Sequence, residues 1–376
     1  MKKFDVVIIG AGPAGVSCAI NCLDQKLSVC IIDKAFFPRE KLCAGILTHK
    51  SEKALIKNGF STSYKNISTN SVDLILDDLT VSLKAKLCLK FVNRSTFDND
   101  LLLQCQFKGA HLLLGLSVKE FNIEKNTLIL TNYEYIGYDF LIIADGVNSK
   151  SRNMLNQPKL KRYLCIQTFI SHHNIKPQLN IYNRLSLKFV KGFIGYQWFV
   201  PNEAGIILGT ALYKENIPFS SLAEIHKYTC SMLVKEGNIA IKGGYVSTGE
   251  IIDFNHQLPN NVVFVGESSG LICPITGEGI YYALLSGQIA AQSINNSLTM
   301  SCSLVSNYTS LIKEHISRIH IDKAVLNKLY AVLVSNYGLA QLKDETQYLA
   351  SLIDDTISTN YSTFNDKYVE ICYLLR

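Results

Sequence analysis

Three glycines near the N-terminus have the spacing of a phosphate-binding turn. Gly10, Gly12 and Gly15 form a G-x-G-x-x-G pattern that also contains Pro13 and Ala14. The first glycine permits a tight turn, the second lets the backbone approach a pyrophosphate, and the third lets a helix pack on a strand. Amides at the start of that helix would present a partial positive charge to the phosphates. Without its flanking elements, the pattern would fit an ordinary glycine turn equally well.

The elements around this turn favour the nucleotide interpretation. Residues 4–9 form an apolar, β-branched run that predicts a strand buried on both faces. A helix is predicted over 14–25 and a second buried strand over 28–32, and Asp33 ends that strand. An acid at this distance from the glycines can accept hydrogen bonds from both ribose hydroxyls and would repel a 2′-phosphate. The unit therefore predicts a site for the adenosine of FAD or NAD rather than NADP.

Two later segments also place polar residues at strand ends. An apolar run ending at Ala144 would deliver Asp145 and Gly146 to the carboxyl edge of a sheet, although Asp-Gly alone also fits a turn. A strand over 262–265 runs into Gly266 and Glu267, and a helix is predicted over 280–291. The amides at its start would stabilise an isoalloxazine ring that gains negative charge on reduction. The loop before this helix contains Pro274, Gly277, Glu278 and Gly279, and the helix begins at Ile280.

In their order and spacing, these three segments resemble the motifs of the class A flavoprotein hydroxylases. In that superfamily the first motif binds ADP, the second lies near the pyrophosphate, and the third reaches the ribitol and the flavin ring. The resemblance implies FAD as the cofactor. Glu267 stands where the superfamily usually has aspartate, which keeps the carboxylate but leaves its contact open.

Two further segments resemble the geranylgeranyl reductases within that superfamily. Residues 37–45 are similar to their P-R-x-K-x-C-G-G pattern, with Ala44 in place of the first glycine. Residues 196–201 and 209–211 are similar to Y-x-W-x-F-P and G-x-G, with departures at Val200 and Ala211. In that family the second segment lies over the flavin and forms a wall of the substrate cavity.

The resemblance then assigns roles to individual residues. Tyr196 and Trp198 would form the cavity wall, and Cys43 is a candidate participant in catalysis because the family places a cysteine beside its flavin. Arg94 opens an R-x-x-F-D segment that places arginine near the flavin or pyrophosphate, while a solvated arginine at a helix start is the alternative. FAD contacts are predicted for Gly10, Gly12, Pro13, Ala14, Gly15, Asp33, Lys34, Arg39, Cys43, Ala44, Gly45, Arg94, Asp145, Gly146, Gly266, Glu267, Pro274, Gly277, Glu278, Gly279 and Ile280.

The predicted fold is α/β, with a Rossmann-like FAD-binding domain interleaved with an antiparallel substrate-binding sheet and followed by a helical C-terminal region. Alternating apolar residues over 72–91 and several runs within 160–250 predict the second sheet. A polar stretch over 292–308 would separate the helix over 280–291 from the helices beyond it. The expected boundaries are 1–70, 92–158 and 250–300 for the cofactor domain, 71–91 and 159–249 for the substrate domain, and 301–376 for the helical region.

The predicted function is that of an FAD-dependent oxidoreductase acting on a hydrophobic substrate, with a geranylgeranyl reductase-like reduction of carbon–carbon double bonds as the first hypothesis. A monooxygenase that hydroxylates an aromatic or polyketide-like substrate is the alternative within the superfamily. A non-catalytic flavin-binding redox module is an alternative of another class. The electron donor would be NAD(P)H or a reduced protein. Because no second nucleotide fingerprint is visible, either donor binding is transient or the donor is another protein.

Composition also narrows the possible protein classes, partners and cellular locations. Hydrophobic residues make up 48% and charged residues 18% of the 376 positions, which excludes a disordered chain. The net charge of +6 is spread without a dense basic block, so no nucleic-acid partner is expected. The 11 cysteines lack metal-ligand spacing, so no metal site is predicted and a reducing, cytoplasmic location is expected. A prenyl-lipid substrate would allow a peripheral membrane contact, and the oligomeric state is not predicted.

Overall fold

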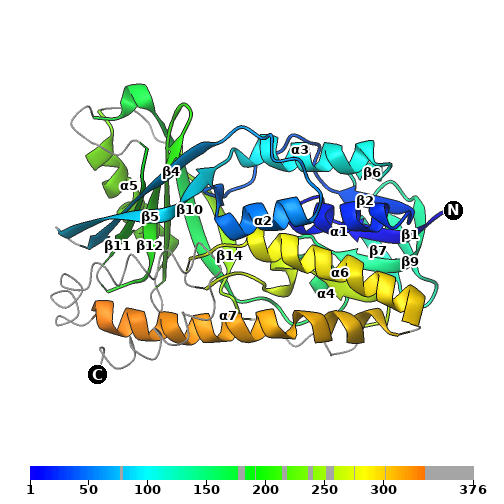
Figure 1. The fold of residues 1–376 in the computed structure, drawn as a ribbon. Coiled ribbons are helices and arrows are strands. Elements are labelled where there is room, and N and C mark those ends of the chain that lie inside the picture. The colour runs from blue at the N-terminus through cyan, green and yellow to red at the C-terminus, as the bar shows by residue number, and fades with distance from the viewer. Residues whose placement is uncertain are drawn as a thin grey trace.

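A computed structural model describes residues 1–334, apart from 77–78, 177–182, 191, 214–217, 236–239, 251–257, 275 and 301. Figure 1 shows two sheets side by side. One of them is covered by helices α1 (Pro13–Asp24), α2 (His49–Lys57) and α6 (Ile280–Met300), and α7 (Leu304–Val334) runs along both. The predicted region after residue 334 lies outside the described residues.

The first sheet contains the strand–turn–helix unit predicted at the N-terminus. β1 (Lys2–Ile9) pairs in parallel with β2 (Val29–Asp33) and with β9 (Tyr135–Ile143). β15 (Val262–Phe264) adds to β9, again in parallel. Because the three predicted motifs follow β1, β9 and β15, they meet at the carboxyl edge of one sheet. Farther out lie β6 (His111–Leu114), which pairs with β2, and the β8 (Thr127–Leu130) and β7 (Val118–Asn122) pair beyond β9.

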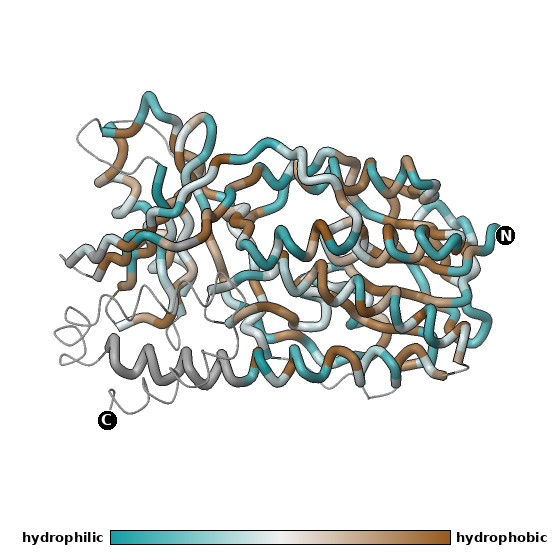
Figure 2. Tube along the Cα trace, in the orientation of Figure 1, coloured by the Kyte–Doolittle hydropathy of each residue, from teal (hydrophilic) through white to brown (hydrophobic). Residues whose placement is uncertain are grey.

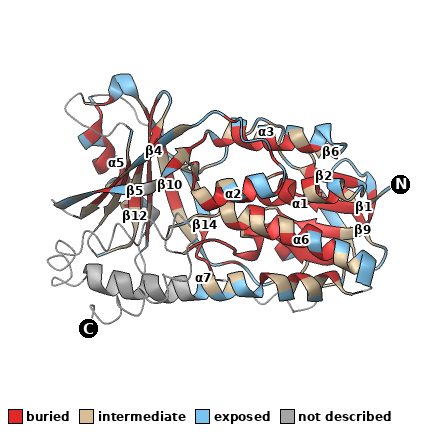
Figure 3. Ribbon diagram, viewed as in Figure 1, coloured by how far each residue is buried: buried red, intermediate tan, exposed pale blue. Residues whose placement is uncertain are grey.

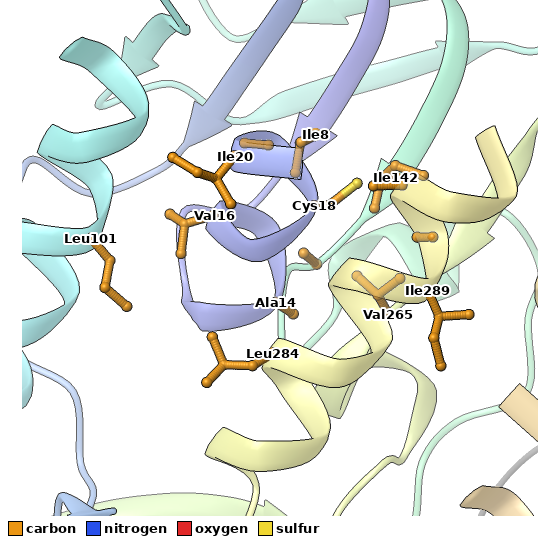
Figure 4. Packing of buried hydrophobic residues seen from close by; sticks show 14 of the residues in the cluster. Ile8, Ala14, Val16, Cys18, Ile20, Leu101, Ile142, Val265, Leu284 and Ile289 are labelled. Atoms are coloured by element: carbon orange, nitrogen blue, oxygen red, sulfur yellow. The ribbon is translucent and has the colours of Figure 1, made fainter. Parts of the chain in front are cut away.

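Helices cover one face of this sheet because its strands alternate between two apolar clusters. Val6 and Ile8 join the cluster under the helices, whereas Val7 and Ile9 join the cluster on the opposite face. Figure 4 shows the first cluster, in which Ile8 and Ile142 of the sheet and helix residues such as Val16, Leu101 and Leu284 are turned toward one another. The helices packed there are α1 (Pro13–Asp24), α2 (His49–Lys57), α3 (Arg94–Phe107), α6 (Ile280–Met300) and α7 (Leu304–Val334).

α6 lies directly against α1. A Cβ atom on Gly287 would overlap the carbonyl oxygen of Ala14, so α6 can approach this closely only with glycine at that position. The Gly266 amide also donates to Ser286 Oγ at 2.8 Å, which joins the third motif to the same helix. α6 therefore covers the first glycine turn with residues from the far end of the sequence.

The second sheet is built from two separate stretches of chain. Its order is β14-β10-β13-β12-β11-β4-β5-β3, antiparallel throughout the described pairs except for β11 with β4. α5 (Phe219–Leu233) covers one of its faces through the cluster that contains Leu208 and Cys230. The strands are β3 (Ile46–Leu47), β4 (Ile67–Leu76), β5 (Leu79–Phe91), β10 (Arg162–Ser171), β11 (Leu185–Phe189), β12 (Ile194–Asn202), β13 (Gly205–Tyr213) and β14 (Lys242–Ser247).

α6 is longer than the sequence predicted. The polar residues after 291 were expected to lie outside the helix, but it continues to Met300 and α7 begins at Leu304. Ser293 Oγ donates to the carbonyl oxygen of Ile289, and Ser297 Oγ donates to that of Ser293, both at 2.8 Å. Side chains that bond to carbonyls four residues earlier let serine continue a helix instead of ending it.

The buried apolar residues lie mainly where the first sheet packs against its helices. Figure 2 shows apolar segments along the strands and inner helix faces, and Figure 3 shows the same segments buried between the first sheet and its helices.

Within the described part of the chain, no helix combines the length and apolar character needed to cross a membrane. The short elements are α4 (Lys150–Met154) and the 3-10 turns η1 (His172–Asn174) and η2 (Gly266–Ser269).

Candidate functional site

Two glycines of the first motif are required by the backbone itself. Gly10 has φ +109°, and a Cβ atom there would overlap the carbonyl oxygen of Ala144 in the second motif. A Cβ atom on Gly15 would overlap the carbonyl oxygen of Gly10. These two residues bring β1, the start of α1 and the end of β9 into contact, as the predicted tight turn and helix packing require.

Gly12 differs because it faces open space. Its backbone is extended, with φ −78°, and the nearest atom to an added Cβ is Arg39 Nη2 at 3.7 Å. Gly12 is also the N-cap of α1, and it supplies no side-chain acceptor to the amides of the first turn. Free amides, a helix N-terminus and a nearby guanidinium are what a pyrophosphate needs.

Asp33 lies beside the same turn. Its Oδ2 accepts a hydrogen bond from the Ala11 amide and its Oδ1 accepts one from the Ala35 amide, both at 2.8 Å. The carboxylate thus fixes the turn while keeping acceptor capacity for ribose hydroxyls. Lys34, which was also predicted to contact the cofactor, is exposed.

An acid that the sequence did not single out holds the two predicted arginines together. Asp98 on α3 binds Arg94 through two bonds, to Nε at 2.7 Å and to Nη2 at 2.8 Å. Arg39 Nη2 reaches the same carboxylate at 3.1 Å. Two guanidinium groups share one buried carboxylate, so the cluster carries a net positive charge beside Gly12. The i,i+4 spacing of Arg94 and Asp98 was the available signal.

Cys43 lies next to this cluster. Its Sγ accepts a hydrogen bond from the Gly45 amide at 3.4 Å, and the thiol also contacts the Arg94 guanidinium. Gly45 has φ +71°, and a Cβ there would overlap the carbonyl oxygen of Val92. Ala44 packs against the apolar cluster of the second sheet. The cysteine segment therefore bridges the arginine cluster and the second sheet.

The second motif contains a buried carboxylate. Asp145 Oδ2 accepts from the Ser151 amide at 3.1 Å, while its Oδ1 has no partner among the described residues. Burial raises the pKa of Asp145, and hydrogen bonds from Ser149 and Ser151 oppose that shift. Gly146 has φ +78°, and a Cβ there would meet no atom within 4 Å. This end of β9 offers an acceptor and open space together.

Hydrogen bonds and one ion pair hold the two acids of the third motif in place. Glu267, predicted to contact FAD, accepts from the Ser247 amide through Oε1 at 3.0 Å. Glu278 accepts from Ser51 Oγ at 2.8 Å and from Thr48 Oγ1, and it pairs with Lys50 at 2.7 Å. The sequence did not single out these three partners. Pro274 and Gly277 lie between Glu267 and Glu278, and Gly279 then leads into α6 at Ile280.

An aromatic row from the second sheet faces this loop. Tyr196 Oη donates to the carbonyl oxygen of Thr276 at 2.5 Å. The Tyr196 ring lies 6.0 Å from Trp198 and 6.1 Å from Phe189, centroid to centroid. A Cβ on Gly209 would overlap the Trp198 ring, so glycine in the neighbouring strand makes room for the indole. Tyr196, one of the two predicted wall residues, thus contacts the third motif, and Trp198 lies beside Tyr196 in the same row.

A buried polar network lies behind the row. His226 on α5 is 2.9 Å from Thr168 Oγ1 through Nε2 and 2.7 Å from Thr210 Oγ1 through Nδ1. Thr168 donates to the Ala240 carbonyl oxygen and therefore accepts from His226, which assigns the proton to Nε2. Gln197, between the two wall aromatics, donates to Thr210 at 3.1 Å. Burial lowers the pKa of His226 to about 4.

The residues present fit FAD. The open face of Gly12 suits a pyrophosphate, and the unpartnered Asp145 Oδ1 is a buried acceptor at the same sheet edge. Gly146 and the N-terminus of α6 leave backbone available around the second and third motifs. Bound FAD would supply hydride chemistry at its ring, while the chain supplies binding and orientation.

Comparisons with known proteins agree with this cofactor. Residues 4–154 match the family described as pyridine nucleotide-disulphide oxidoreductase. An uncharacterized protein of Methanosarcina barkeri is 32% identical over 79% of this chain and 76% of its own length. The digeranylgeranylglycerophospholipid reductase of Methanocella arvoryzae is 25% identical over 96% of this chain and 97% of its own.

A solved structure shares the whole fold. The geranylgeranyl bacteriochlorophyll reductase-like protein of Thermoplasma acidophilum superposes with a TM-score of 0.79, at 19% identity, over 100% of this chain and 99% of that one. This confirms the predicted fold class. The family match and the relatives show that the chain belongs to the geranylgeranyl reductase-like FAD-dependent oxidoreductases, which are enzymes.

Proposed function

We propose that the protein reduces carbon–carbon double bonds in a prenyl chain. The observation that carries this proposal is the aromatic row formed by Phe189, Tyr196 and Trp198, which is joined to the third motif by the hydrogen bond of Tyr196. Half-buried aliphatic side chains, including Leu187 and Ile207, join Trp198 in one apolar cluster. A wall of this composition suits a long hydrophobic substrate with few polar groups. The names of relatives, which describe reductases, support the same proposed reaction.

Reduction of a double bond adds a hydride to one carbon and a proton to the other. Reduced FAD supplies the hydride when bound. We assign the proton to the Cys43 thiol, which the Gly45 amide and the Arg94 guanidinium hold in place. The guanidinium also stabilises the thiolate that forms when the proton leaves. The electron donor that restores reduced FAD would be NAD(P)H or a reduced protein.

Anaerobic single-turnover mixing tests the reaction. The FAD-loaded protein is reduced with dithionite, freed of excess reductant and mixed with geranylgeranyl diphosphate. We expect the flavin to reoxidise and mass spectrometry to show a product heavier by two hydrogens. Cys43→Ser should slow this reoxidation at least tenfold, whereas Cys88→Ser, which changes an exposed cysteine, should leave it unchanged.

The same preparation distinguishes the reductase from the alternative function, a monooxygenase. Reduced protein that leaves the prenyl chain intact but hydroxylates an aromatic probe when oxygen is admitted would be a monooxygenase. That result would refute the reductase proposal while leaving the FAD site in place.

A further inference from the structure

A buried ion pair joins α2 to the third motif. Lys50 Nζ lies 2.7 Å from Glu278 Oε2, and each side chain is only 6% exposed. Lys50 lies in the first turn of α2, and Glu278 lies two residues before α6. Charges removed from water to this degree are screened far less than surface charges, so their balance affects whatever binds beside them.

The other oxygen of Glu278 is bound by the start of α2. Oε1 accepts from Ser51 Oγ at 2.8 Å and from Thr48 Oγ1, and Thr48 is also the N-cap of the helix. A carboxylate at a helix N-terminus is stabilised by the partial positive charge there. Glu278 is therefore held by two hydroxyls, an ammonium group and a helix end, which fixes the loop that carries it.

Two tyrosines favour a charged ammonium on Lys50. Its Nζ lies 5.0 Å from the ring centre of Tyr281 and 5.7 Å from that of Tyr282, both in the first turn of α6. A cation over aromatic faces is attracted by their electron density, more so when water is excluded. Lys50 thus contacts both the loop residue Glu278 and the helix that follows it.

We propose that Lys50 and Glu278 are positioning residues that keep the N-terminus of α6 electrically balanced beside the flavin. Because their charges cancel, the partial positive charge of α6 is left to act on the ring. The inference rests on FAD lying at the third motif, and it does not depend on which substrate is reduced.

Removing either partner breaks the same ion pair but leaves opposite charges behind. Lys50→Met leaves a buried carboxylate, which disfavours electron gain by the flavin and should lower its midpoint potential. Glu278→Gln leaves a buried ammonium and should raise it. A contact that only held the loop in place would shift both variants in one direction.

The test is a midpoint-potential titration of FAD-loaded protein without substrate. We expect the order Lys50→Met, wild type, Glu278→Gln from lowest to highest, with the double variant close to wild type. Lys50→Arg should restore the wild-type potential. Lys53→Met removes the same charge from an exposed position on α2 and should leave the potential unchanged.

Three results would overturn the proposal: single-variant shifts of the same sign, no shift in either variant, or a Lys53→Met shift as large as that of Lys50→Met. If Lys50→Met fails to retain FAD, Glu278→Gln decides alone, and an unchanged or lowered potential refutes the idea. Since no prenyl substrate is present, failure of the reductase proposal cannot produce any of these results.

Discussion

Gly10 and Gly12 are two positions apart but have different roles, one in the fold of the turn and the other in cofactor binding. Gly10 is constrained by the protein, since its φ of +109° and the Ala144 carbonyl oxygen leave no room for a side chain. Gly12 has an ordinary φ and open space in front of it. Substitution should therefore damage folding at one position and cofactor binding at the other.

Gly12→Val should fold and lose FAD. The added side chain would occupy the space that a pyrophosphate needs, and its Cβ would lie 3.7 Å from the nearest protein atom, Arg39 Nη2. Circular dichroism should match the wild type, and the purified variant should be colourless.

Gly10→Val is the matched control. It should yield little folded protein, because both the positive φ and the overlap with Ala144 oppose it. Stoichiometric FAD in the Gly12 variant would contradict the assignment of the first motif.

At this scale, local patterns predict the glycine turn and Asp33, but not the side-chain partners brought together by folding. Asp33 and Arg39 lie at predicted motif positions beside the turn. Lys50 and Glu278 are more than 200 positions apart, and no periodicity links a helix residue to a distant loop. Such pairs arise only once α2 and α6 are packed, so a single sequence gives no signal for them.

Among the elements, β12 carries different chemistry on its two faces. Tyr196 and Trp198 form the aromatic row, while Gln197 between them enters the polar network of α5. Alternation along a strand requires this division. The wall pattern was predictable from the sequence, but His226 was not, because an isolated histidine in a helix has no distinguishing spacing.

His226 should make stability depend on pH. Its pKa is about 4 in the folded protein and about 6.5 when unfolded. The unfolded chain therefore takes up a proton first, and stability that is complete above pH 6.5 decreases as the pH falls toward 4. The full loss is roughly 3 kcal/mol in the free energy of unfolding.

Urea unfolding of wild type and His226→Gln at several pH values measures this effect. The difference between them should shrink as the pH falls from 7 to 4. His173→Gln, which alters an exposed histidine, should follow the wild type throughout. A constant difference would mean that the pKa of His226 is the same in the folded and unfolded states, which would contradict the lowered pKa.

On the scale of the whole molecule, two sheets meet at the cofactor loop. Tyr196 of the second sheet bonds to Thr276, while Gly266 of the same motif packs on α1 over the first sheet. The segments that form the cofactor site come from both ends of the described chain, which matches the predicted interleaving. Figure 1 shows the third motif region between the two layers.

Tyr196→Phe should loosen this connection without unfolding either sheet. Loss of one hydrogen bond is worth about 1 kcal/mol, so amides near Gly277 should exchange several-fold faster. The Gly277 amide, which donates to Cys273, is the reporter, and the Val6 amide in β1 is the control. Equal acceleration at both would indicate global destabilisation instead of a local link.

The packing of α6 on α1 also has a consequence for biosynthesis. The first glycine turn is synthesised before Gly287, the residue whose lack of a side chain lets α6 cover that turn. Contacts this distant in sequence form slowly. The apolar surface of α1 therefore stays uncovered until α6 has been synthesised, and we expect capture of the nucleotide to follow the docking of α6.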